Sequence, residues 1–162
     1  MDSEQWEGSL AMSNLPHADS FRDLLVYQKA RQLSREIFQL TAKFPKDELL
    51  SLTSQIRRSS RSSGANLAEA WAKRRYENHF ISKLTDADME QQETQHWLET
   101  AVDCGYCDVE TAAHLRRKCE EIGRLLGGMI EKANLFCGAT PRTLREIPSE
   151  YFANDDPSTT DH

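Results

Sequence analysis

The sequence predicts an all-α protein: an antiparallel, up-down-up-down four-helix bundle with disordered acidic tails. Apolar residues recur at alternating intervals of four and three along four successive stretches, and this spacing places them on one face of a helix. Residues 46–140 contain no proline, so long helices are permitted there. The 162 residues suit one domain, and the short connections between the stretches favour antiparallel neighbours.

The first helix is expected to begin at Asp19 or Ser20, either of which can cap it, and to end at Lys43. Its apolar stripe consists of Val26, Ala30, Leu33, Ile37, Leu40 and Phe44. Pro45 ends the helix, because the residue before a proline avoids helical geometry.

The second helix is expected over residues 47–76, with Asp47 and Glu48 placing negative charge at its positive end. Its stripe consists of Leu49, Leu52, Ile56, Ser59, Ser63, Leu67 and Ala70. The serines in the middle of this stripe are small enough for a neighbouring helix to approach closely. Gly64 costs about 1 kcal/mol of helix propensity relative to alanine, which indicates either close packing or a kink at that point.

The third helix is expected over residues 77–104, and Gly105 can take the left-handed turn that ends it. Its stripe consists of Phe80, Leu84, Ala87, Gln91, Thr94, Leu98 and Ala101. Asp108 is expected to cap the fourth helix, which runs to Phe136 and is closed by Gly138. The fourth stripe consists of Ala112, Leu115, Cys119, Ile122, Leu126, Met129 and Ala133.

The net charge of -6 belongs to the flanks of the chain. Residues 1–19 hold four acidic and no basic residues, and residues 138–162 hold five acidic and two basic residues. We therefore expect disordered tails at 1–18 and, for the most part, at 138–162, around a bundle at 19–137. No apolar run is long enough to cross a bilayer and the N-terminus lacks the features of a secretion signal, so we expect a cytoplasmic protein with reduced thiols.

Charge is divided unequally between the second and third helices. Residues 43–75 carry eight basic against three acidic residues, whereas residues 76–110 carry one basic against nine acidic residues. Three interpretations remain open: solvated faces with weak ion pairs, contacts between the basic face of one subunit and the acidic face of the next, and phosphate binding. The candidates for nucleic-acid binding are Arg57, Arg58, Arg61, Lys73, Arg74 and Arg75.

The sequence predicts no catalytic site, no metal site and no cofactor. A di-metal site in a helix bundle needs two Glu-x-x-His pairs, and the sequence has one, Glu93 and His96. The CxxC motif of Cys104 and Cys107 lies at a turn and lacks the two further ligands that a zinc site needs. A ligand site inside the bundle is the alternative to a hydrogen-bonded network that fixes helix register. That network is expected from Asn66, Asp88, Gln91 and Thr94.

Eight short stretches occur together in an order that characterises a known family. They are LVYQKA at 25–30, FP at 44–45, QIRRSS at 55–60, ANLAEA at 65–70, WAKRRY at 71–76, HFISKLTDAD at 79–88, ETQHWL at 93–98 and DCGY at 103–106. Over residues 24–136 the chain thereby resembles the 23S rRNA-intervening sequence proteins, or S23-like proteins.

The resemblance implies a bacterial, homopentameric barrel of four-helix bundles. Some relatives are encoded within 23S rRNA insertions, and others are accessory proteins of diversity-generating retroelements, which bind nucleic acid and a reverse transcriptase through a basic surface. Those accessory proteins are strongly basic, whereas residues 20–137 here hold 18 basic and 17 acidic residues.

Our hypothesis is a non-enzymatic, ring-forming protein that contacts structured RNA or a ribonucleoprotein through the basic face of the second helix. One alternative is a protein-interaction scaffold whose charges serve subunit assembly only. The other is a retroelement accessory protein.

Overall fold

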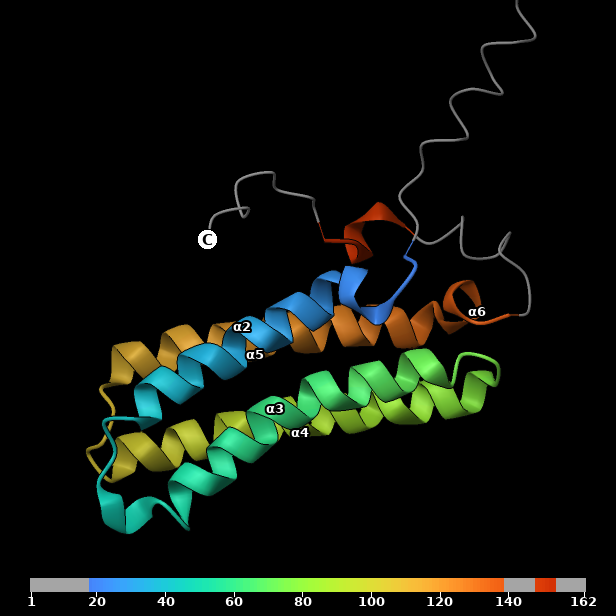
Figure 1. Ribbon diagram of the computed structural model, residues 1–162. Coiled ribbons are helices and arrows are strands. Elements are labelled where there is room, and N and C mark those ends of the chain that lie inside the picture. Colours follow the sequence, from blue (N-terminus) through green and yellow to red (C-terminus); the bar gives the residue numbers. More distant parts are fainter. Residues whose placement is uncertain (1–17, 139–147, 154–162) are drawn as a thin grey trace, which may run out of the picture.

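The computed structural model describes residues 18–138 and 148–153. Within these residues the fold is all-α, without a strand, and four long helices alternate in direction (Figure 1). They are α2 (Leu25–Thr41), α3 (Leu52–Ala72), α4 (Glu77–Asp103) and α5 (Val109–Glu131). Each helix packs against two others, in the cyclic order α2, α3, α4, α5. The predicted antiparallel four-helix bundle is confirmed. None of the described helices is both long and apolar enough to cross a membrane.

The first long helix begins five residues later than Ser20. Ser20 caps a short 3-10 helix, η2 (Phe21–Asp23), by accepting the Arg22 backbone N–H at 3.1 Å, while the Asp23 carboxylate accepts the Ser20 N–H at 3.1 Å. Leu24 then has extended backbone, so α2 cannot begin before Leu25. The capping residue was predicted correctly, but it caps a shorter helix than expected.

The second helix was predicted too long at both ends. Residues 46–48 form a 3-10 helix, η3 (Lys46–Glu48), and α3 begins only at Leu52. Glu48 caps α3 from outside it: one carboxylate oxygen accepts the Leu52 N–H at 3.1 Å and the Ser51 hydroxyl at 2.6 Å. At the other end, residues 73–76 form the turn into α4 instead of a further helical turn.

Serine allows α3 and α4 to pack closely, as the sequence predicted. Ser59 and Ser63 are fully buried, and the Ser59 hydroxyl lies 2.8 Å from the Thr94 hydroxyl. Ser63 donates to the Ala87 backbone carbonyl at 3.2 Å, which brings its helix directly against the α4 backbone. At Gly64, an added Cβ would lie 3.7 Å from the Tyr27 ring, an ordinary contact that does not require glycine.

The C-terminus of α4 and the N-terminus of α5 follow the capping signals. Gly105 has φ of +74°, its N–H donates to the Val102 carbonyl at 2.9 Å, and the next N–H donates to the Ala101 carbonyl, which is a Schellman motif. The Asp108 carboxylate caps α5. The predicted fourth helix breaks at Lys132, and a short helix follows, α6 (Ala133–Phe136).

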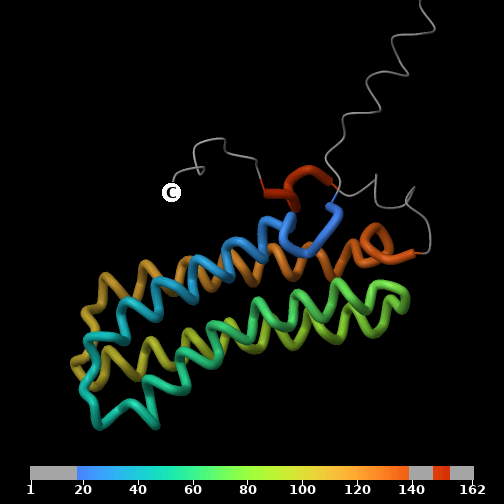
Figure 2. Tube along the Cα trace, in the orientation of Figure 1, coloured from blue at the N-terminus to red at the C-terminus, as the bar shows by residue number. Residues whose placement is uncertain are grey.

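Residues 148–153, which we call the C-terminal strap, pack against the bundle, although the sequence assigned them to a mostly disordered tail. The strap contains η5 (Ser149–Tyr151), and Tyr151 and Phe152 are only 5% and 6% exposed. Phe152 forms an isolated bridge with Leu24 (Figure 2 shows the two ends of the bundle chain side by side). Ala18, also assigned to a disordered tail, is 2% exposed and belongs to the core. The packed unit is therefore larger than residues 19–137, and residues 1–17, 139–147 and 154–162 of the predicted tails lie outside the described residues.

Candidate nucleic-acid interface

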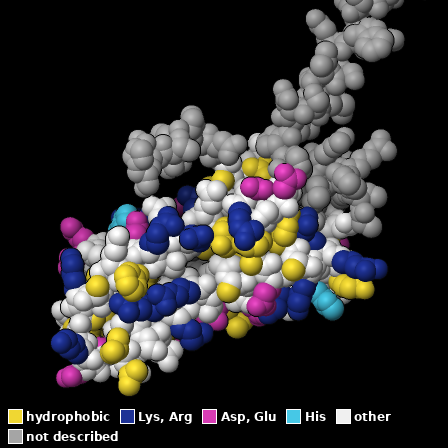
Figure 3. All heavy atoms as spheres, viewed as in Figure 1, with side chains coloured by type: hydrophobic (Ala, Val, Ile, Leu, Met, Phe, Trp, Pro, Cys, Tyr) yellow, Lys and Arg dark blue, Asp and Glu magenta, His cyan; other side chains and the backbone are white. Residues whose placement is uncertain are grey.

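Four arginines gather on the face formed by α2 and α3, and we call them the arginine face: Arg31, Arg35, Arg57 and Arg61. Arg61 lines one surface hollow with Arg31, a second with Arg35 and a third with Arg57. No acidic side chain lines any of the three. Figure 3 shows Lys and Arg side chains concentrated over this side of the molecule.

Helix geometry places these side chains together. Arg31 and Arg35 are four residues apart on α2, and Arg57 and Arg61 are four apart on α3, so each pair shares one face of its helix. The Phe38 ring, 49% exposed, lies beneath two of them: the guanidinium carbons of Arg57 and Arg61 are 4.6 and 6.0 Å from its centroid. These cation–π contacts hold the guanidinium groups over the ring.

Acidic side chains that could neutralise the arginine face are engaged elsewhere. Glu36 of α2 pairs with Lys118 of α5 at 3.4 Å, and Glu69 of α3 pairs with Lys83 of α4 at 2.8 Å. Within the described residues, no ion pair involves an arginine of this face. Arg31, Arg35 and Arg61 are exposed and direct their charge to solvent, whereas the half-buried Arg57 donates its Nε–H to the Thr41 hydroxyl at 2.8 Å.

Arg58 lines the same hollow as Arg57 and Arg61 but, unlike them, is paired with acidic side chains. It forms an ion pair with Glu90 at 3.4 Å and another with Glu93, both on α4. The hydrogen bond to Glu93 raises the pKa of Arg58. Burial disfavours the charged form of Glu93, but hydrogen bonds from Arg58 and Trp97 outweigh this and lower its pKa. Arg58 thus joins α3 to α4, a role that the sequence did not distinguish from phosphate binding.

The other three predicted residues lie at the far end of α3, where the chain turns into α4. Arg61 and Lys73 are twelve positions apart, or about 18 Å along a helix axis. Arg74 lies over the buried Trp71, with its guanidinium carbon 3.5 Å from the ring centroid and its Nε–H donating to the Trp71 carbonyl at 2.9 Å. Burial lowers the pKa of Arg74. Lys73 and Arg75 are exposed.

The structure therefore divides the six predicted residues into three groups. Arg57 and Arg61 lie on one face without an ion pair, beside the paired Arg58, and they join two residues that the sequence reasoning missed, Arg31 and Arg35. The available signal was the four-residue spacing of these arginines beside the buried stripe of the first helix.

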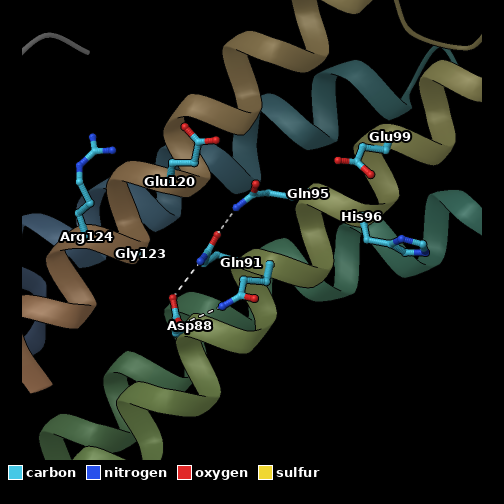
Figure 4. Close-up of a pocket in the computed structure, with 9 residues that line it drawn as sticks. Asp88, Gln91, Gln95, His96, Glu99, Glu120, Gly123 and Arg124 are labelled. Carbon is cyan, nitrogen blue, oxygen red and sulfur yellow. Dashed lines mark hydrogen bonds between the residues drawn. The ribbon is translucent and has the colours of Figure 1, made fainter.

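The opposite side of the bundle, between α4 and α5, is hollowed by a groove of about 680 Å³ (Figure 4). Of the four residues predicted to form a polar network, two bond elsewhere: the Thr94 hydroxyl pairs with Ser59, and Asn66 donates to the Ser62 backbone carbonyl. Asp88 and Gln91 do lie along this groove, in a chain of hydrogen bonds in which Gln91 donates to Asp88 at 2.8 Å and Gln95 donates to Gln91 at 2.7 Å. Gly123 leaves space for it, because a Cβ there would lie 2.8 Å from the Gln91 amide nitrogen. The remaining lining residues are Gln92, His96, Glu99, Glu120 and Arg124.

The cysteines and carboxylates form no metal centre within the described residues, where no group of three potential ligands comes together. All four cysteines are free thiols. Cys104 is exposed, whereas Cys119 is fully buried and its burial raises the pKa to about 12.

Comparison with known proteins identifies the family. The family model of the 23S rRNA-intervening sequence proteins matches residues 22–128, most of the bundle. A crystal structure of a protein with unknown function from the S23 ribosomal protein family of Bacteroides thetaiotaomicron VPI-5482 is 30% identical, with a TM-score of 0.60, and the match covers 66% of this chain and 99% of that one. No curated protein matches the chain. Because the family match spans more than half of its length, this chain belongs to the 23S rRNA-intervening sequence protein family.

Proposed function

We propose that this protein has no enzymatic role, assembles into a homo-oligomeric ring and contacts structured RNA, or a ribonucleoprotein, through the arginine face. One observation carries the proposal: four arginines share a surface on which none of them is used in an ion pair of the described structure. Membership of the family, in which the resemblance implies pentameric barrels, supports the ring.

The chemistry of the arginine face suits a phosphate backbone. The planar guanidinium group presents a fork of N–H donors that matches phosphate geometry and keeps its charge at all physiological pH values. Hydroxyl groups of Ser54 and Ser62 line one of the hollows, and hydroxyls donate readily to phosphate and sugar oxygens. Such contacts do not depend on base sequence, so the affinity should fall steeply as salt is added.

The test reverses charge where no described hydrogen bond is lost. In Arg35→Glu/Arg61→Glu, binding of a labelled RNA hairpin is measured by fluorescence anisotropy over a series of salt concentrations. We expect weaker binding and a slope of log affinity against log salt that falls by about 0.7–0.9 for each phosphate contact removed. The matched control is Arg117→Glu/Arg124→Glu on α5, which changes the net charge equally and breaks no ion pair of the described residues. Equal losses in the two variants, or affinity that does not respond to salt, would refute the proposal.

Assembly is the second candidate for the same charges. The groove between α4 and α5 contains Asp88, Glu99 and Glu120 and lies opposite the arginine face, so one copy could bind the next head to tail. Light scattering without nucleic acid separates the two candidates. If Arg35→Glu/Arg61→Glu reduces the particle mass, the arginines serve subunit contacts. If the mass is unchanged and only RNA binding falls, they serve RNA.

The retroelement alternative has a separate readout. An accessory protein of that kind would bind a reverse transcriptase, so purified reverse transcriptase from a retroelement should co-elute with this chain. Absence of a complex, together with RNA binding, would favour the leading proposal.

A further inference from the structure

The turn between α3 and α4 combines exposed aromatic rings with exposed cations. Tyr76 is 57% exposed and His79 is also exposed, and their ring centroids are 5.4 Å apart with an interplanar angle of 54°. The guanidinium carbon of Arg75 lies 5.8 Å from the centroid of the Tyr76 ring. Lys73 completes this cluster at the C-terminus of α3. Figure 3 shows Lys and Arg atoms beside hydrophobic and histidine atoms at this end of the molecule.

Folding does not account for tyrosine at this position. Tyr76 is the N-cap residue of α4, where Ser, Thr, Asp or Asn would accept a backbone N–H, yet its side chain makes no capping hydrogen bond. Its ring is largely in solvent and belongs to neither core cluster of the described residues. A residue that satisfies neither the helix terminus nor the core is an expected feature of a functional site.

Arg74 is held against the turn, which leaves Tyr76, Lys73 and Arg75 exposed. Arg74 covers Trp71 and uses its Nε on the Trp71 carbonyl, so it supports the turn instead of facing solvent. Glu77 is the acidic residue nearest in sequence. Burial is the main cause of the raised pKa of the Cys137 thiol, and the negative charge of Glu77 raises that pKa further. The turn therefore presents one aromatic ring pair beside Lys73 and Arg75, and neither cation forms an ion pair with another residue that the structure describes.

We propose that Tyr76, with His79 beside it, is a stacking platform for an unpaired base of the RNA, and that Lys73 and Arg75 contact the flanking phosphates. This inference rests on the proposed function and adds the class of RNA that it binds: a single-stranded loop or end. Bases within a duplex are stacked on one another and cannot reach a side chain, whereas unpaired bases stack on aromatic rings. The arginine face, about 18 Å along α3, would hold the adjoining backbone.

The test compares two probes on the full chain by fluorescence anisotropy at one salt concentration. One is a short labelled oligouridylate, and the other is an RNA duplex with the same number of phosphates. Tyr76→Leu keeps apolar bulk but removes the π face. We expect it to weaken binding of the single strand by about 5- to 150-fold, the range for loss of one stacked base, and to change duplex binding by less than about 2-fold.

The conservative variant Tyr76→Phe keeps the ring and should bind the single strand as the wild-type chain does. Thermal unfolding of Tyr76→Leu should match the wild-type curve, because the side chain is exposed. Substituting 2-aminopurine into the oligonucleotide gives a second readout, since stacking on Tyr76 quenches its fluorescence and Tyr76→Leu should restore it.

The outcomes separate this inference from the proposed function. If Tyr76→Leu binds both probes as the wild type does, while Arg35→Glu/Arg61→Glu weakens both, the platform is refuted and the arginine face stands. If Tyr76→Leu weakens single-strand binding and the arginine variant does not, the platform stands without the face. Equal losses of the two probes in Tyr76→Leu refute stacking, and wild-type protein that binds neither probe refutes both proposals.

Discussion

Two adjacent glycines on α5 should respond in opposite directions to alanine. At Gly128, a Cβ would lie 2.2 Å from the hydroxyl oxygen of Tyr151 and 3.2 Å from the ring carbon that bears it. At Gly127, no atom lies within 4 Å of the same position. The difference arises only because the C-terminal strap is docked, so these substitutions report on the strap.

The magnitudes follow from two opposing effects. Alanine gains about 1 kcal/mol over glycine within a helix, so Gly127→Ala should stabilise the protein by about that amount. Gly128→Ala receives the same gain but forces the buried Tyr151 out of place, and overpacking of this kind costs about 1–3 kcal/mol. The two variants should therefore differ by about 1–3 kcal/mol in the free energy of unfolding.

The assay is urea unfolding of each variant at one protein concentration, which keeps any oligomer contribution constant. A partner variant, Tyr151→Ala, removes the obstacle: in that background Gly128→Ala should become as stabilising as Gly127→Ala. If Gly128→Ala is already as stable as Gly127→Ala in the wild-type background, Tyr151 does not occupy its site against α5 and the reasoning is wrong.

Three further outcomes can be checked. Hydrogen bonds from Ser51, Leu52 and Tyr106 lower the pKa of Glu48 in the folded state, so ionised Glu48 stabilises the fold at pH values above the ordinary carboxyl pKa. The difference in unfolding free energy between wild type and Glu48→Gln should therefore be present at neutral pH and vanish as the pH falls below about 4, which urea unfolding at several pH values would measure. Cys104 should react with iodoacetamide in the native protein while the buried Cys119 reacts only after unfolding, as peptide mass spectrometry would show; early labelling of Cys119 would contradict its burial. Ser63→Val should destabilise the fold by about 1–3 kcal/mol because it loses its bond to the α4 backbone and adds volume where the helices touch, whereas the exposed Ser54→Val should stay within about 0.5 kcal/mol.

Helix periodicity predicted the bundle because each helix must bury one continuous stripe, and that requirement is local in sequence. Capping residues predicted some helix ends for the same reason: Asp108 and Gly105 act within one turn of their own positions. The predicted start of α3 was wrong because Leu49 continues the apolar stripe in sequence, although its side chain is 56% exposed and lies before the helix begins. Periodicity identifies which apolar residues share a face; it does not show how far a neighbouring helix extends to cover them.

The candidate site was predicted less well because it depends on how separate helices dock. Arg57 and Arg58 are adjacent in sequence, yet one step along a helix turns the side chain by about 100°, enough to send Arg58 to α4. Arg31 and Arg35 join the face only through the packing of α2 on α3. The sequence did not predict the strap because six residues are too few to show a periodic pattern of apolar side chains. The two available signals were Gly128 within a helix and the adjacent aromatic residues Tyr151 and Phe152.

The bridge between Leu24 and Phe152 joins positions 128 residues apart, the difference between their numbers. Such a contact forms only after the intervening chain has folded, because closing so long a loop costs entropy that local helix contacts do not. Next to it, the Ala153 N–H donates to the Asp23 carbonyl at 2.9 Å, so both ends of the bundle chain belong to one unit that opens together. Removal of the residues that precede Leu24 should therefore accelerate amide hydrogen exchange at Tyr151 and Phe152, while exchange in the core helices stays unchanged.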